Sequence, residues 1–312
     1  MINRRHIRVK VMQSMYAMIH AHNDDIIKEE KFLKHSNQKL FDLYALQLQL
    51  MIEVQKQAAK KLELSKKKHL ATKEDLNPNT KFVYNRALAV LTESASLATY
   101  IDSHNLNNWD ADDEYVKIIW KELEASDLFK RYMSLEEDSF QHDKAFIIEF
   151  YKQIIAPNDK LAEYYEDTTI SWVDDIPYVN TAVVKALNKL KKDGPFFLGS
   201  LYKDVDDEKF VSLLFKKSIL HHTSYEENIK AKTPNWETDR IADMDMILIK
   251  MAITEFLHFP SIPTRVTINE YIEIAKDYST QKSSYFINGV LDKISKEFIE
   301  EKRIVKIGRG LL

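Results

Sequence analysis

Apolar residues recur at intervals of three and four along most of the chain, and strict alternation of apolar and polar residues is scarce. This pattern is typical of amphipathic helices and leaves little of the chain for sheet. A stripe of apolar residues from Leu40 to Val54 predicts a long helix that ends near Lys68. The predicted fold class is therefore all-α. Further helices are predicted over residues 81–101, 112–133, 138–155, 178–192, 206–231, 236–258, 267–279 and 283–301.

The two ends of the chain differ from its middle. Residues 1–24 predict a basic N-terminal helix, and over residues 206–312 helices follow one another with short connections. Residues 25–205 are also helical, but their composition indicates no particular chemistry. We interpret residues 25–205 as a helical insertion into a smaller core, and the role of the insertion stays open.

The composition excludes several classes of enzyme. Five glycines, at positions 194, 199, 289, 308 and 310, permit neither a G-x-G-x-x-G motif nor a P-loop. The absence of cysteine excludes a thiolate zinc site and a cysteine nucleophile, and it fits a reducing compartment. We expect a cytoplasmic protein that is not an enzyme and needs no cofactor or metal. Because 45 basic and 48 acidic residues nearly balance, an anionic partner must be bound by a local patch.

The most apolar stretch of the chain covers residues 244–259. Lys250 and Glu255 interrupt it, and it is shorter than the roughly 18 residues that a membrane span requires. We therefore predict no membrane span.

Four cations crowd the start of the first predicted helix. Arg4, Arg5, Arg8 and Lys10 lie within residues 1–10, which contain no acid, and the helix is expected to begin near Asn3. Cations at a helix N-terminus oppose the macrodipole by roughly 0.3–1 kcal/mol each, so helix stability does not explain the cluster. An anionic partner would explain the cluster, because arginines about 100° apart on the helix can contact a phosphate backbone from two sides. The alternative is that these residues only keep the terminus soluble.

Two helix starts stand out in the C-terminal segment. Thr267 and Glu270 have the spacing of a capping box, and Ser283 or Ser284 can cap the next helix. Gly289 lies inside that helix, which predicts a close backbone approach to another element. Phe286 lies in its first turn, where composition alone favours a core position over an exposed one.

Five groups of residues, at the two ends of the chain, form a recurring combination. They are Arg4-Arg5, Arg8, Gln13 and Tyr16 in the first helix, Trp236 to Asp245 with Ala252 to Glu255, Ile268-Asn269-Glu270, Ala275-Lys276, and Phe286-Ile287-Asn288-Gly289-Val290-Leu291-Asp292-Lys293. In their order and spacing these residues resemble the NusB family of transcription antitermination and ribosomal-RNA processing factors. The resemblance covers residues 1–24 and 206–301.

The resemblance implies an all-helical fold of two packed bundles and an RNA-binding function. The family's role would be to bind the boxA sequence of nascent ribosomal RNA as a heterodimer with the ribosomal protein NusE, and to act on RNA polymerase. Arginine-rich and aromatic residues would meet single-stranded RNA through phosphates and stacked bases. The implied RNA contacts are Arg4, Arg5, Arg8, Lys10, Lys282, Ser283 and Phe286, and the implied partner contacts are Asp245 and Thr264. Lys282 replaces an acid of a compact relative and is expected to favour phosphate.

Three other interpretations stay open. The protein could be a helical scaffold whose insertion binds another protein. It could also be a non-catalytic relative of the rRNA methyltransferases that carry NusB-like domains, although it lacks the cysteine and the glycine-rich cofactor fold of those enzymes. His221-His222 and Glu226 have a spacing that could place two metal ligands on one helix face, but surface or hydrogen-bonded histidines are favoured because no third ligand is evident.

Overall fold

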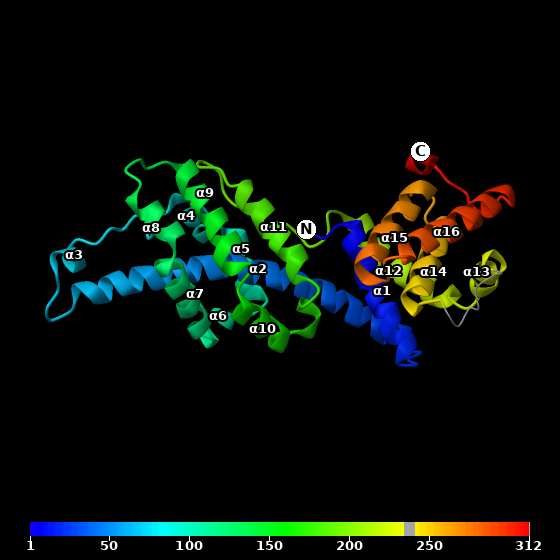
Figure 1. The fold of residues 1–312 in the computed structure, drawn as a ribbon, viewed down its shortest axis with the longest axis horizontal. Helices are drawn as coiled ribbons and strands as arrows, with labels where there is room; N and C mark the ends of the chain where they lie inside the picture. The colour runs from blue at the N-terminus through cyan, green and yellow to red at the C-terminus, as the bar shows by residue number, and fades with distance from the viewer. Residues whose placement is uncertain (234–240, 312) are drawn as a thin grey trace. The chain divides into compact units, whose positions relative to one another are not determined.

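The computed structural model describes residues 1–233 and 241–311, and every regular element in that part of the chain is a helix (Figure 1). The predicted all-α class is confirmed. The chain divides into two compact units, which we call the middle unit (Met1 and residues 38–200) and the terminal unit (residues 2–37 and 201–311). These boundaries lie at 37/38 and 200/201, whereas the sequence suggested 24/25 and 205/206. In the described residues no helix is both long and apolar enough to cross a membrane.

Helix α2 (Ile26–Lys66) belongs to both units, and its first turns are held by the terminal unit. Glu30 pairs with Lys216 at 2.9 Å, and the amide of Asn37 donates to the hydroxyl of Tyr202 at 3.0 Å. These contacts explain why residues 25–37 and 201–205 belong to the terminal unit and not to the middle unit.

The middle unit is a helical domain around a core rich in aromatic residues. The indole N–H groups of Trp109 and Trp172 donate to backbone carbonyls of α2, and Asp143 is buried, where it accepts from the hydroxyl of Tyr132 at 2.8 Å and from Arg86 Nε at 2.8 Å. Besides α2 its helices are α3 (Lys73–Leu76), α4 (Arg86–Thr92), α5 (Ala95–Ser103), α6 (Asn108–Ala111), α7 (Asp113–Ala125), α8 (Asp127–Ser134), α9 (Phe140–Phe150), η1 (Tyr151–Ile155), α10 (Asp159–Thr168), η2 (Ile170–Trp172) and α11 (Ile176–Asn188).

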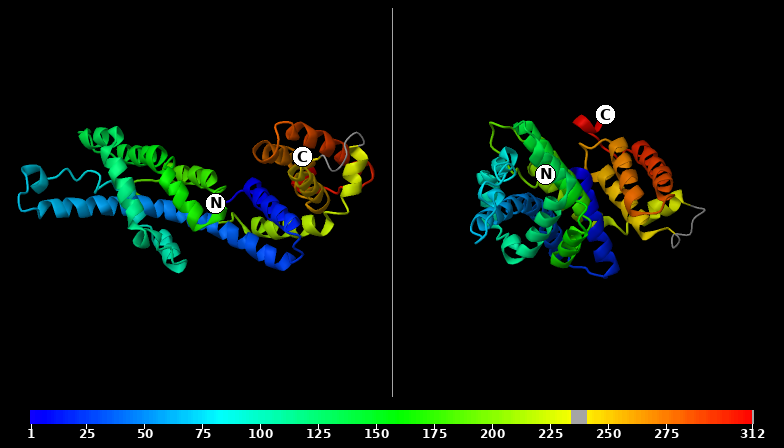
Figure 2. Two further views of the ribbon diagram at one scale, coloured as in Figure 1. Left: turned by 60° about the horizontal axis from the view of Figure 1, so that its bottom comes forward. Right: turned by 60° about the vertical axis from the view of Figure 1, so that its left-hand side comes forward.

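The terminal unit is a bundle in which helix α14 packs against α12, α15, α16 and α1. Both views in Figure 2 show the orange and red helices α15 and α16 side by side. The helices of this unit are α1 (Arg4–His20), the start of α2, α12 (Val205–His221), α13 (Glu226–Lys232), α14 (Asp243–His258), α15 (Thr264–Tyr278), α16 (Ser283–Glu300) and the short η4 (Gly308–Leu311). Residues 236–240 of the predicted helix 236–258 lie outside the described residues.

Side-chain caps divide several segments that the periodicity predicted as single helices. The region 81–101 forms α4 and α5, because the hydroxyl of Ser94 accepts from the backbone N–H of Leu97 at 3.2 Å and starts a new helix. Ser126 starts α8 in the same way, with Phe129 N at 3.1 Å. The region 206–231 also forms two helices, α12 and α13, although α13 begins without a side-chain cap bond, and α10 was not predicted.

The predicted capping box of Thr267 and Glu270 is wrong. Helix α15 begins one turn earlier, at Thr264, and its N-cap residue Pro263 makes no side-chain cap bond. Thr267 is therefore inside the helix on its buried face, where its hydroxyl donates to Glu255 at 3.1 Å. The turn before α15 ends in two residues, Ile262 and Pro263, that offer no capping hydroxyl, so the local spacing of Thr267 and Glu270 was misleading.

Candidate functional site

The N-terminal arginines are positioned by the start of α1. The side chain of Asn3 accepts a hydrogen bond from the backbone N–H of His6 at 2.8 Å, which confirms the predicted helix start. This start places Arg4, Arg5 and Arg8 in the first two turns, on faces that meet different neighbours.

Arg8 points into the bundle and forms a bidentate ion pair with Glu255 of α14. Its Nε lies 2.5 Å from Oε1 and its Nη2 lies 2.9 Å from Oε2, and only 3% of the Arg8 side chain is exposed. The hydroxyls of Thr267 and Tyr271 donate to the same carboxylate at 3.1 and 2.8 Å. The buried carboxylate is thus fully surrounded by donors, as a buried charge requires.

The charge on Arg8 is stabilised by this pairing. Burial alone would lower the pKa of Arg8, but the charge of Glu255 and its hydrogen bonds outweigh burial and raise that pKa above its ordinary value. Lys10 is buried as well, and its Nζ lies 3.2 Å from the hydroxyl of Ser36 on α2. The sequence led us to expect RNA contacts from Arg8 and Lys10, but both side chains face the interior.

Arg4 and Arg5 remain accessible on the surface of the terminal unit. Arg5 donates through Nε and Nη2 to the carboxylate of Glu270, both at 2.9 Å, and its side chain is 49% exposed. Arg4 pairs with Asp207 at 2.7 Å and is 39% exposed. Burial would raise the pKa of Glu270, but the hydrogen bond from Arg5 and the charges of Arg8 and Arg5 hold it below its usual value. Each arginine therefore keeps a solvent-facing part while a carboxylate fixes its direction.

The arginines border a hollow of about 570 Å³. Helix α15 packs against both α1 and α16. None of the residues that line the hollow belongs to α16, so the arginines and Phe286 share one unit but not one pocket. The lining residues are Asn3, Arg4, Arg5, Arg8, Ser261, Ile262, Pro263, Val266 and Glu270.

A hydroxyl cluster fixes the turn before α16. Ser283 is buried, and its hydroxyl accepts from the backbone N–H of Thr280 at 3.2 Å and lies 3.0 Å from the hydroxyl of Ser279. Ser279 donates to the buried Asp245 at 2.5 Å. Ser283 does not cap α16, as the sequence suggested; the N-cap residue is Lys282, without a side-chain cap bond. Ser283 and Asp245 thus join the start of α14 to this turn.

The solvent-facing side of the first turns of α16 carries what we call the α16 face. Lys282, Tyr285, Asn288 and Gly289 are exposed and Phe286 is half-buried. Tyr285 is 81% exposed and was missed by the sequence analysis, although positions 282, 285 and 289 follow the helical spacing of a solvent face. The predicted close approach at Gly289 is wrong within the described residues, because a Cβ there would meet nothing within 4 Å.

Three other residues that the sequence analysis singled out have ordinary surroundings in the structure. Thr264, the expected partner contact, is the half-buried first residue of α15. Glu226, the possible metal ligand, pairs with Lys250 at 2.8 Å, and His221 stacks on His258 with ring centres 5.1 Å apart. The described residues contain no group of three side chains that could hold a metal ion.

The sequence analysis did not identify Glu255 as the partner of Arg8. A carboxylate inside the most apolar stretch of the chain is nevertheless a signal for a buried cation.

Lys306 packs beside this buried carboxylate. Its ammonium donates to the backbone carbonyls of Phe259 at 3.0 Å and of Glu255 at 3.3 Å. Burial lowers the pKa of Lys306 from 10.5 to about 8, although the charge of Glu255 opposes the shift. Between these two values the unfolded chain binds more protons at Lys306 than the folded chain, so stability rises with pH in that window.

We expect this rise to disappear in Lys306→Met. Between about pH 7.5 and about pH 9.5, the wild type is expected to gain about 1–2 kcal/mol of unfolding free energy relative to the variant, a value reduced for partial solvent screening. Urea unfolding at both pH values measures the difference. If the difference in unfolding free energy between wild type and variant does not change with pH, the pKa of Lys306 is not lowered by burial.

Comparison with known proteins finds relatives of part of this chain. The model of the NusB family matches residues 180–296. The chain is 40% identical over 112 residues to the transcription antitermination protein NusB of Salinibacter ruber, a match that covers 36% of this chain and 70% of that protein. No solved structure matches.

Two further relatives carry the same name. Identity is 38% over 109 residues to the transcription antitermination protein NusB of Chloroherpeton thalassium, covering 35% of this chain and 52% of that protein. It is 44% over 72 residues to that of Natranaerobius thermophilus, covering 23% and 52%. The chain thus spans about half the length of these two relatives. The family match includes the α16 face and excludes most of the middle unit.

Proposed function

Because this chain belongs to the NusB family, we propose that it is a non-enzymatic transcription antitermination factor that binds boxA-type single-stranded RNA of nascent rRNA. In this proposal the ribosomal protein NusE binds alongside it, and the assembly acts on RNA polymerase.

The observation that carries the proposal is the α16 face. An exposed tyrosine, Tyr285, adjoins the half-buried Phe286, and Lys282 lies at the start of the same helix. Unpaired bases stack on accessible rings while a nearby cation meets the phosphates, and this combination is typical of single-stranded RNA binding. The exposed Gly289 supports it, because a glycine inside a helix costs about 0.5–1 kcal/mol and leaves room for a strand to approach the backbone.

The arginines divide into two roles in this proposal. Arg4 and Arg5 meet phosphates with their exposed edges, and the carboxylates of Asp207 and Glu270 hold them in place. Arg8 and Lys10 position α1 from within and do not contact RNA. Ser283 and Asp245 likewise position the start of α16, which leaves Thr264 as the accessible residue among the two expected NusE contacts.

Titration of the full-length protein with labelled RNA tests this function. We expect boxA-like RNA to bind more tightly than a scrambled strand, and the difference to grow when the ribosomal partner is added. Fluorescence anisotropy at several salt concentrations measures both affinities. Equal affinity for the two strands, with and without the partner, would reject the proposal.

The double variant Arg4→Ala/Arg5→Ala tests the phosphate contacts. We expect weaker RNA binding and a salt dependence whose slope falls by roughly 0.7 for each phosphate that the protein no longer neutralises, because fewer counterions are released. Arg131→Ala, which removes an exposed arginine of the middle unit, is the matched control. If Arg4→Ala/Arg5→Ala keeps the wild-type affinity and salt slope, as the control is expected to do, then Arg4 and Arg5 do not contact RNA.

A further inference from the structure

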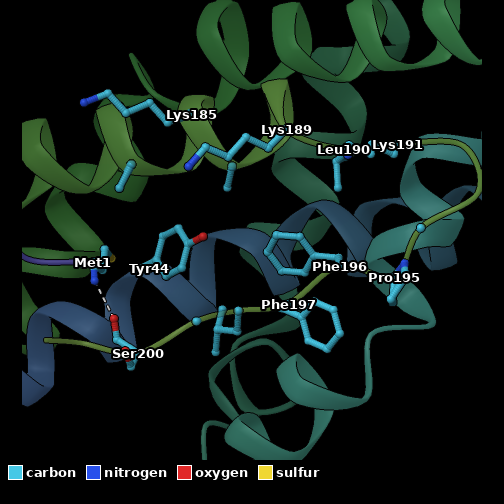
Figure 3. A pocket seen from close by; sticks show the side chains of 15 residues that line it. Met1, Tyr44, Lys185, Lys189, Leu190, Lys191, Pro195, Phe196, Phe197 and Ser200 are labelled. Atoms are coloured by element: carbon cyan, nitrogen blue, oxygen red, sulfur yellow. Dashed lines mark hydrogen bonds between the residues drawn. The ribbon is translucent and has the colours of Figure 1, made fainter. Parts of the chain in front are cut away.

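The middle unit contains a pocket of about 590 Å³ whose lining includes neither the N-terminal arginines nor any residue of the α16 face. One wall is the C-terminal part of α11 and the other is the extended segment 194–200, which we call the strap (Figure 3). Tyr44 of α2 lies between them. The volume falls within the roughly 300–1,000 Å³ of common ligand sites.

The strap is firmly attached to the unit. The carbonyl oxygen of Phe196 accepts from the hydroxyl of Ser94 at 2.8 Å, and the backbone N–H of Leu198 donates to the hydroxyl of Ser96 at 3.0 Å. The side chains of Phe196 and Leu198 are buried. The strap therefore has a defined position even though it forms no helix.

Between these two anchors the strap presents an aromatic ring to solvent. Phe197 is 72% exposed, and Figure 3 shows it on the opposite side of the strap from Phe196. Alternation of side chains along an extended segment places it there, since both neighbours are buried. Because the backbone that carries this exposed ring is already fixed, stacking on a planar group does not require the strap to be ordered first.

The other wall carries positive charge without compensation. Lys185 and Lys189 lie on successive turns at the end of α11, and Lys191 follows it. None of the lining residues is acidic, and these three lysines form no ion pair within the part of the chain that the structure describes. The dipole of α11 favours a cation at its end, but it does not explain three cations beside an exposed ring.

We propose that this pocket binds single-stranded nucleic acid, with Lys185, Lys189 and Lys191 meeting its phosphates and Phe197 stacking on a base. Neighbouring phosphates and bases on one flexible strand match cations on one side of the strap and a ring on the other. An acidic peptide would meet the lysines but would leave the ring unused. The small side chains of Ala182 and Ala186 leave the wall open to a strand. The site would be a second contact for an RNA strand, separate from the α16 face.

The test uses the full chain and a fluorescein-labelled oligouridine of about 12 nucleotides, in a Tyr285→Ala background that weakens the α16 face. Phe197→Ala is expected to weaken binding about fivefold to 140-fold, the range for loss of one stacked base. Lys185→Ala/Lys189→Ala is expected to lower the salt slope by about 1.4, which corresponds to two phosphates of a single strand. Tyr84→Ala, and Lys117→Ala/Lys121→Ala on α7, are matched controls with exposed residues in the same unit and are expected to bind like the parent.

Crosslinking gives an independent result. A 4-thiouridine strand is expected to crosslink to the peptide that contains residues 194–200. Unchanged affinity in both pocket variants, or crosslinks confined to α16, would overturn the proposal. Competition by polyglutamate in the wild type, together with no effect of Phe197→Ala, would instead assign the pocket to acidic peptides. Because boxA binding is measured separately, failure here leaves the proposed function of the terminal unit untouched.

Discussion

Replacing Glu255 with glutamine is expected to destabilise the terminal unit by roughly 3 kcal/mol, because it leaves the buried guanidinium of Arg8 with only the longer contact to Glu270, at 3.5 Å, as a counter-charge. The glutamine keeps the size of the side chain but presents an amide N–H to a site where Arg8, Thr267 and Tyr271 all donate. Urea unfolding followed by circular dichroism measures the loss. Hydrogen exchange is expected to speed up in α1 and α14 and to stay unchanged in α9 of the middle unit.

Two control variants isolate the buried pair. Glu270→Gln removes a partly exposed pair with Arg5 and the longer contact of 3.5 Å with Arg8, and it is expected to cost about 1 kcal/mol or less because Glu255 still neutralises Arg8. The double variant Arg8→Met/Glu255→Leu removes both charges and is expected to recover much of the stability, because neither partner is left uncompensated. If Glu255→Gln is no more destabilising than Glu270→Gln, the pair does not hold α1 on the bundle.

Replacing both rings of the α16 face, Tyr285→Ala/Phe286→Ala, is expected to reduce affinity for boxA-like RNA by about tenfold to several hundredfold. Each stacked base contributes roughly 1–3 kcal/mol, and the two contributions need not add fully. Anisotropy titration measures the change, and Tyr84→Ala, which removes a similarly exposed tyrosine of the middle unit, is the control.

Single variants separate stacking from folding. Tyr285 is so exposed that Tyr285→Ala is expected to leave the unfolding free energy unchanged while it weakens RNA binding. Phe286→Ala is expected to lower the affinity for RNA clearly and the helical content only slightly. Loss of the fold in Phe286→Ala, with normal RNA binding by Tyr285→Ala, would show that Phe286 serves the core and that Tyr285 does not contact the RNA.

The helices near both chain ends could be predicted closely from local sequence. Asn3 caps α1 as expected, and the predicted helix 283–301 is α16 at Ser283–Glu300. The cap of α1 and the extent of α16 both depend on residues within one or two turns, and such local preferences can be predicted from the sequence. The periodicity failed where a single hydroxyl, as at Ser94 or Ser126, interrupts a continuous apolar stripe and starts a new helix.

The sequence by itself determined that this chain is helical, that cations gather at the start of α1 and that a ring lies in the first turn of α16. Only the tertiary structure decided which of these side chains face solvent. Arg5 and Arg8 are three residues apart, yet Arg5 is half exposed and Arg8 is buried against Glu255, a residue 247 positions away. The accessibility of a charge depends on the partner that packing brings to it, and no local pattern contains that partner.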